Sequence, residues 1–235
     1  MLVIASAVIV LAAIAVTLGV VLSSGSSKAA VPAHGSLTNA LPGAADVQQL
    51  LRGIPQHGNV LGSGSAPVTL VEYVDLQCPY CQQFETQAMP SLIANYVRTG
   101  KVKIEARPLA FIGPDSQTGR AAALAAGEQN KLFNFAQILY LNQGTENTGW
   151  LNDQMIVSAG ASIPGLDVSR LLADSKSNVV KAQAGTYDQQ AAENSVQATP
   201  TILVGKSVGP LRPVTLTSPT DGQSVASAIS AALAG

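Results

Sequence analysis

The sequence predicts an α/β fold with an inserted helical domain, preceded by an N-terminal transmembrane helix, and three observations support the α/β part. A strand, a helix and a second strand follow one another between Val68 and Ala106, which is the order of a parallel βαβ unit. Residues from about 114 to 195 have the apolar spacing of helices and no convincing strand pattern. A short strand over Thr201–Gly205 and a final helix complete the order of elements.

The chain begins with an apolar run, Leu2 to Leu22, that contains no charged residue. At 1.5 Å per residue a helix of this length spans roughly 30 Å, the thickness of the hydrocarbon core of a bilayer. We therefore predict a transmembrane anchor over residues 1–22. A cleaved signal is the main alternative, because the Ala-rich stretch 28–33 could hold a processing site. A buried globular helix is a further alternative.

Residues 23–57 are predicted to be a linker with one short helix. The stretch 23–42 is rich in Ser, Gly, Ala and Pro, which is typical of a flexible tether, and His34 within it is expected to be solvated. Residues 45–52 then form an amphipathic helix, because Val47, Leu50 and Leu51 fall on one helical face.

Residues 58–235 are predicted to form the folded domain. Val68–Val74 is a strand buried on both faces, with Glu72 as its exceptional carboxylate. The apolar period then changes to four, which predicts a helix from Pro79 to about Arg98. Its first turn suits proline, and Met89-Pro90 is expected to kink it midway.

The remaining elements follow from the same patterns. Further strands are expected at 58–62, 101–106 and 213–217, and Asp221 is expected to cap the last helix. The helices of the insertion are predicted at 121–128, 132–141, 152–160, 167–172 and 177–193.

The composition excludes some classes of function. Charged residues make up 11% of the chain and the net charge is -1, with no basic stripe, which argues against a nucleic-acid partner. Two cysteines cannot build a disulfide framework, so a hydrophobic core must hold the fold.

The only two cysteines, Cys78 and Cys81, lie where the buried strand ends and the helix begins. The sulfur of Cys78 is therefore expected near the free N–H groups and the positive end of the helix dipole, which stabilise a thiolate. A thiolate of low pKa is also a good leaving group in disulfide exchange. We expect Cys78 to be the exposed, reactive cysteine and Cys81 to be the deeper one that resolves the mixed disulfide.

Two other interpretations of the pair are open. A static disulfide would close a very short loop and remove little chain entropy. A zinc site would need two more ligands, for which only His34 and His57 are available. No metal or cofactor is therefore expected beyond a redox-active Cys78–Cys81 disulfide.

The stretch from Ala66 to Glu85, with Cys-Pro-Tyr-Cys directly after the strand, resembles the DsbA-like branch of the thioredoxin superfamily. Ala198–Val204, with Thr199-Pro200, resembles it as well. The resemblance covers roughly residues 60–233 and implies a thioredoxin-like fold with an inserted helical domain. It also implies a protein thiol:disulfide oxidoreductase.

Roles for single residues follow from this resemblance. Cys78 and Cys81 match the redox pair. Pro200 matches a cis-proline that begins a strand and lies against the active-site sulfurs. Thr199 matches the residue whose backbone pairs with substrate.

Four further residues are expected to tune the site. Glu72 and Glu85 match acids found near the deeper cysteine in some relatives, although Glu72 could equally be an acid satisfied by a local partner. Pro79 and Tyr80 lie between the cysteines, and Tyr80 stands where some relatives carry His. Because Tyr carries no positive charge, the redox potential is open.

The sequence therefore predicts a membrane-tethered thiol oxidase outside the cytoplasmic membrane, with the thiols of exported proteins as substrates. The resemblance implies a quinone-linked membrane partner that reoxidises the pair. A reductase or isomerase of the same fold is the alternative, and a non-catalytic peptide-binding module is another. Asp75 is expected to bind turn amides, and Trp150 to pack in the core rather than to form a substrate platform.

Overall fold

The computed structural model of the chain describes residues 31–235. The transmembrane helix predicted over residues 1–22 lies outside this range, as does the first part of the predicted linker. None of the helices within residues 31–235 combines the length and the apolar character needed to cross a membrane. The compact unit of the chain begins at Pro32 and runs to Gly235.

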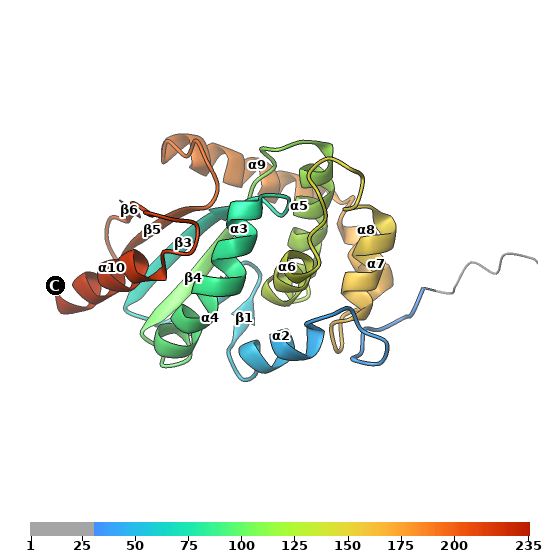
Figure 1. Cartoon of the computed structure of the whole chain (residues 1–235), viewed down its shortest axis with the longest axis horizontal. Coiled ribbons are helices and arrows are strands. Elements are labelled where there is room, and N and C mark those ends of the chain that lie inside the picture. The colour runs from blue at the N-terminus through green and yellow to red at the C-terminus, as the bar shows by residue number, and fades with distance from the viewer. Residues whose placement is uncertain (1–30) are drawn as a thin grey trace, which may run out of the picture. The chain divides into compact units, whose positions relative to one another are not determined.

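The core of the unit is a six-stranded sheet with the strand order β1-β2-β4-β3-β5-β6 (Figure 1). β3 is parallel to β4 and antiparallel to β5, and every residue of β3 is buried, as a strand covered on both faces requires. The strands are β1 (Gln56–His57), β2 (Val60–Leu61), β3 (Val68–Val74), β4 (Val102–Pro108), β5 (Thr201–Lys206) and β6 (Arg212–Val214). The strand predicted at 213–217 is therefore shorter and begins one residue earlier.

The helix predicted from Pro79 to about Arg98 is present, but its middle is not a regular α-helix. It consists of α3 (Pro79–Gln83), a π-helical turn η2 (Phe84–Ala88), α4 (Met89–Leu92) and a second π-helical turn η3 (Ile93–Val97). Pro90 has no N–H to donate, and the wider turn before it bonds the amide of Met89 to the carbonyl of Phe84. The expected kink therefore takes the form of a π turn.

The helical insertion lies between β4 and β5, as predicted. Its helices are α5 (Pro114–Gly127), α6 (Leu132–Leu141), α7 (Asp153–Ala161), α8 (Val168–Asp174) and α9 (Asn178–Glu193). α5 begins seven residues before the predicted start at 121. The prediction missed these residues because the first turns of α5 are polar and lack an apolar stripe. α7, α8 and α9 each have a side-chain cap at the N-terminus. The capping side chains, which accept a backbone N–H of the first turn, belong to Asn152, Asp167 and Ser177.

The flexible tether predicted for residues 23–42 is wrong for the part that the structure describes. The amides of Gly35 and Ser36 donate to the carbonyls of Leu166 and Ala161, each at 2.8 Å, so this strap is bound to the helical insertion. Gly35 is buried, and a Cβ at this position would collide with the carbonyl of Ile163. The side chain of His34 is exposed, as expected.

Two helices close the unit. α2 (Ala44–Leu51) is the predicted amphipathic helix and buries Val47 and Leu51 against α6. α10 (Gly222–Ala234) is capped by Asp221 and packs on β5 beside α4, while α9 contacts α5 and β4. The sheet thus brings the end of β3, the start of α3 and the start of β5 together.

Candidate active site

Cys78 lies at the junction between β3 and α3. It is the N-cap residue of α3, with an extended backbone (φ -70, ψ 120), and Cys81 lies in the first helical turn. Both are free thiols; Cys78 keeps 5% of its surface exposed, whereas Cys81 is completely buried. Only Cys78 can therefore be reached by another molecule, as the sequence predicts. Tyr80, between them, is 58% exposed.

Thr199 lies directly against Cys78, and Pro200 follows it in the chain. The Cys78 thiol donates to the carbonyl of Thr199 at 3.3 Å, and the Thr199–Pro200 peptide bond is cis, as expected from the resemblance. Pro200 immediately precedes β5, whose first residue Thr201 is paired with Tyr73 near the end of β3. The antiparallel pairing of β5 with β3 thus brings a segment more than a hundred residues later in the chain to the redox pair.

The two thiols have opposite pKa shifts. The pKa of Cys78 is lowered to about 6, mainly by the hydrogen bond with the Cys81 thiol. Burial raises this pKa, but hydrogen bonds with Thr199 and with the amides of Cys81 and Tyr80 lower it further. Burial is the main cause that raises the pKa of Cys81 well above its ordinary value, followed by the hydrogen bond and the charge of Cys78. The accessible sulfur is therefore the thiolate at neutral pH.

Asp75 organises the turn between β3 and α3. It is completely buried, and its Oδ1 accepts the amide of Gln77 at 2.9 Å, as predicted. Its Oδ2 accepts the amides of Phe111 and Ile112 at 2.8 and 3.1 Å. These last two bonds tie the turn to the loop after β4, which could not be predicted from the sequence near Asp75.

Glu72 and Glu85 form a buried pair of carboxyl groups beneath the cysteines. Burial raises the pKa of Glu72 to about 7, and burial followed by the charge of Glu72 raises the pKa of Glu85 well above its ordinary value. Glu72 Oε2 and Glu85 Oε1 have no donor among residues 31–235, and a proton held between the two groups satisfies both. The pair therefore carries at least one proton at neutral pH.

Two residues of α6 that sequence reasoning missed complete this buried cluster. Gln137 Nε2 donates to Glu85 Oε2 at 2.6 Å, and the hydroxyl of Tyr140 donates to the carbonyl of Asp75 at 3.4 Å. Burial, and then the charges of Cys81 and Glu85, raise the pKa of Tyr140. The available signal was the presence of two polar residues, Asn134 and Gln137, in a helix that is otherwise apolar and largely buried.

Trp150 packs partly buried against the hydrophobic core and against Gly144, in agreement with the predicted packing role.

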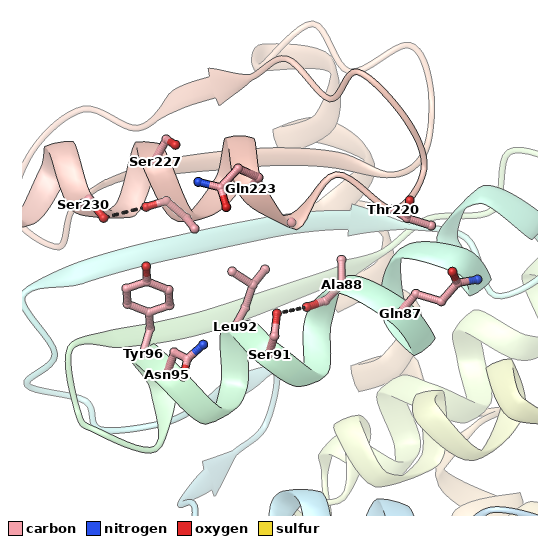
Figure 2. A pocket seen from close by; sticks show the side chains of 12 residues that line it. Gln87, Ala88, Ser91, Leu92, Asn95, Tyr96, Thr220, Gln223, Ser227 and Ser230 are labelled. Atoms are coloured by element: carbon pink, nitrogen blue, oxygen red, sulfur yellow. Dashed lines mark hydrogen bonds between the residues drawn. The ribbon is translucent and has the colours of Figure 1, made fainter.

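A groove of about 690 Å³ lies away from the cysteines, between the helix η2–α4 and α10. Figure 2 shows that it is lined by uncharged side chains, among them Gln87, Ser91, Gln223 and Ser227. Neither cysteine lines it, and its side chains include no thiol, carboxylate or imidazole, so it carries no part of the thiol chemistry.

The chain is similar to a family model, to curated proteins and to solved structures. Residues 56–217 match the model of a family described as thioredoxin. The probable disulfide bond formation protein D of Bacillus cereus is 31% identical over 147 residues, which are 61% of this chain and 68% of that protein.

Two solved structures are similar as well. The oxidised form of BdbD from Bacillus subtilis superposes with a TM-score of 0.66 at 22% identity, over 77% of this chain and 98% of that one. DsbA2 of Pseudomonas aeruginosa superposes with a TM-score of 0.55 at 25% identity, over 76% of this chain and 95% of that one.

Proposed function

The chain belongs to the DsbA-like branch of the thioredoxin superfamily and is a thiol:disulfide oxidoreductase, and from this premise we propose that it is a dithiol oxidase that forms disulfides in exported proteins. The observation that carries this direction is the lowered pKa of Cys78. A stabilised Cys78 thiolate favours the reduced form of the pair, so its disulfide is a strong oxidant.

The reaction proceeds by two thiol–disulfide exchanges. A substrate thiolate attacks Cys78 Sγ of the Cys78–Cys81 disulfide, and the bond to Cys81 breaks, leaving Cys81 as a thiolate that takes up a proton. A second substrate thiolate then attacks the substrate sulfur of the mixed disulfide and releases Cys78 as a thiolate. Two electrons pass to the cysteine pair, and the substrate gains one disulfide.

The surroundings of the two sulfurs suit these steps. Cys78 leaves readily in the second exchange because its pKa is low. Cys81 becomes a basic thiolate in the first exchange, since its pKa is raised, and the protonated Glu72–Glu85 pair lies in the same buried cluster as a source of the proton.

The substrate backbone is proposed to pair with Thr199, whose carbonyl already accepts the Cys78 thiol. Tyr80 and Phe111 are 58% and 49% exposed on segments joined to the active-site turn, and they offer apolar surface to an unfolded chain.

We further propose that the domain is tethered by residues 1–22 and acts on the extracytoplasmic side of the membrane. Disulfides form and persist in oxidising compartments, and a pair that oxidises many substrates must itself be reoxidised. A quinone-linked membrane protein is the proposed electron acceptor. Fractionation of cells that express the full chain tests the tether, since recovery in the secreted, soluble fraction would overturn it.

The reduction potential of the pair tests the oxidase proposal. The protein is equilibrated with glutathione buffers, and the fraction of reduced Cys78–Cys81 is measured. A value near about -120 mV supports an oxidase, whereas a value near about -270 mV would overturn it in favour of a reductase.

A further inference from the structure

The turn that carries Cys78 is bound from outside by the loop between α6 and α7, residues 142–150. Gln143 Nε2 in this loop donates to the carbonyl of Leu76 at 2.9 Å and to the carbonyl of Cys78 at 3.3 Å. These two carbonyls flank Gln77, so a single side chain of the helical insertion holds both ends of the peptide segment that leads into α3.

Gln77 binds the same loop from the other side. Its side chain is completely buried, and its Nε2 donates to Ser116 Oγ at 2.9 Å and to Asn147 Oδ1 at 3.2 Å. Its Oε1 accepts the backbone amide of Asn147 at 2.7 Å. Every polar atom of this buried amide is thus paired. Leaving such buried atoms unpaired is costly, so Gln77 specifies where the loop must lie.

The contacts close into a ring. Asn147 Nδ2 donates to the carbonyl of Ile112 at 3.2 Å, and the amide of Ile112 donates to Asp75 Oδ2 at 3.1 Å. Asp75 Oδ1 in turn accepts the amide of Gln77 at 2.9 Å. Gly113 leaves room for this arrangement, because a Cβ there would collide with Asn147 Oδ1. Two segments far from the turn in sequence, residues 112–116 and 143–147, therefore surround the turn before Cys78.

We propose that Gln77 and Gln143 are positioning residues of the redox site, through which the helical insertion holds the Cys78 turn in its reactive geometry. Among residues 31–235, neither side chain is hydrogen-bonded to a sulfur. Gln143 binds the carbonyls of Leu76 and Cys78, whereas Gln77 binds the loop that carries Asn147. The inference rests on the proposed role of Cys78, because a turn that holds an unreactive thiol would need no such control.

The expected consequence concerns the first turn of α3. The amides of Tyr80 and Cys81 face the Cys78 sulfur and stabilise its thiolate. When Gln143 no longer holds the carbonyls of Leu76 and Cys78, the turn can rotate, and these amides lose their alignment with the sulfur. The thiolate is then less stable and the reactivity at neutral pH falls.

The test compares Gln143→Met and Gln77→Met with a matched control, Gln129→Met. Gln129 forms the same kind of two-bond clamp elsewhere in the insertion, donating to the carbonyl of Asp167 at 3.0 Å and accepting its amide at 2.8 Å. For each reduced protein, the Cys78 thiolate is titrated by its ultraviolet absorbance, and the urea midpoint of unfolding is measured in parallel.

We expect Gln143→Met and Gln77→Met to raise the pKa of Cys78 by about one unit, whereas Gln129→Met lowers the urea midpoint without moving that pKa. Unchanged pKa values in the first two variants, or an equal shift in the control, would overturn the proposal. If Gln77→Met does not fold, Gln143→Met and Gly113→Ala still decide the outcome, since Gly113→Ala displaces Asn147 without removing an amide from the turn.

The titration needs no substrate and no redox partner. A reduction potential that contradicts the oxidase proposal would therefore leave this result standing, and the two proposals can fail separately.

Discussion

The two sides of the cysteine pair differ in nearly every property that sets thiol chemistry. On the Cys78 side, hydrogen-bond donors and the Thr199 loop surround a sulfur that keeps some exposure. On the Cys81 side, the sulfur is completely buried and shares its surroundings with Glu72, Glu85 and Tyr140. The first setting stabilises a thiolate, and the second opposes one.

This difference shows how two identical side chains in one helical turn come to have separate roles. The pKa of Cys78 is lowered to about 6, whereas the pKa of Cys81 is raised well above its ordinary value. The spacing of the cysteines permits a disulfide, but their unequal environments decide which sulfur exchanges with substrate and which one is protonated. Each prediction below changes one side of this asymmetry.

The largest effect is expected from the cysteines themselves. Cys78→Ser should lower the rate of substrate oxidation by on the order of a thousandfold or more, since the exchanging sulfur is lost. Cys81→Ser should instead accumulate mixed disulfides between Cys78 and substrate, because the neighbouring thiol can no longer attack the mixed disulfide and only a second substrate thiol can release Cys78. Non-reducing electrophoresis after acid quenching separates the outcomes. Equal trapping by both variants would contradict the assignment of roles.

Replacing a buried carboxyl group should change the pH dependence of stability. The pKa of Glu72 is raised from 4.5 to about 7, so its contribution to stability is present below about pH 4.5 and is lost as the pH rises through about 7. At pH ~8.5, Glu72→Gln should therefore unfold at higher urea than the wild type, with a free energy of unfolding that is higher by up to ~3 kcal/mol. At pH ~4.5, the two proteins should unfold at similar urea concentrations.

Urea unfolding of the reduced proteins at the two pH values measures this difference. Asp188→Asn provides a control, because Asp188 lies in a half-exposed ion pair with Arg120 rather than in the buried cluster. A constant gap between Glu72→Gln and the wild type at both pH values would show that the carboxyl pair does not titrate as described.

The Cys78 side should leave its own signature in the stability of the reduced protein. Its pKa is lowered from 9.0 to about 6, so the stabilisation is fully present above about pH 9 and is lost as the pH falls through about 6. The reduced protein should therefore resist urea better than the oxidised protein at pH ~8, with a margin that shrinks towards pH ~5. A margin independent of pH would argue against an activated Cys78.

The smallest effect is expected from Tyr80, which is 58% exposed, so solvent screens any charge placed there. Tyr80→His introduces a partial positive charge beside the Cys78 thiolate and should make the potential more oxidising, by about 30 mV or less. Tyr80→Phe is the matched control, since it changes no charge, and equilibration with glutathione measures both. A shift of equal size in Tyr80→Phe would mean that packing, rather than charge, sets the potential here.

Local patterns in the sequence were sufficient for much of the fold. The buried strand Val68–Val74, the change of period at Pro79 and the capping of the last helix by Asp221 depend on neighbours within a few residues. Backbone hydrogen bonding and apolar periodicity act over this same short range, so the elements could be read before the fold was known.

Part of the site was predictable for the same reason. The strand, the cysteines and the start of the helix are contiguous, and Thr199-Pro200 was placed by its resemblance to a known family. That Glu72 and Glu85 would meet could not be read from local pattern, since it depends on how η2 packs over β3 and on Gln137 from a third element.

By itself, the sequence determined which elements form and where the reactive pair lies, because short-range periodicity, capping and cysteine spacing carry that information. Only the tertiary structure decided what surrounds the pair. Gln143 and Gln129 look alike in the sequence, yet one binds the Cys78 turn and the other binds Asp167. A polar side chain acquires its role from the partner that the packed chain brings to it, and burial then makes that partner obligatory.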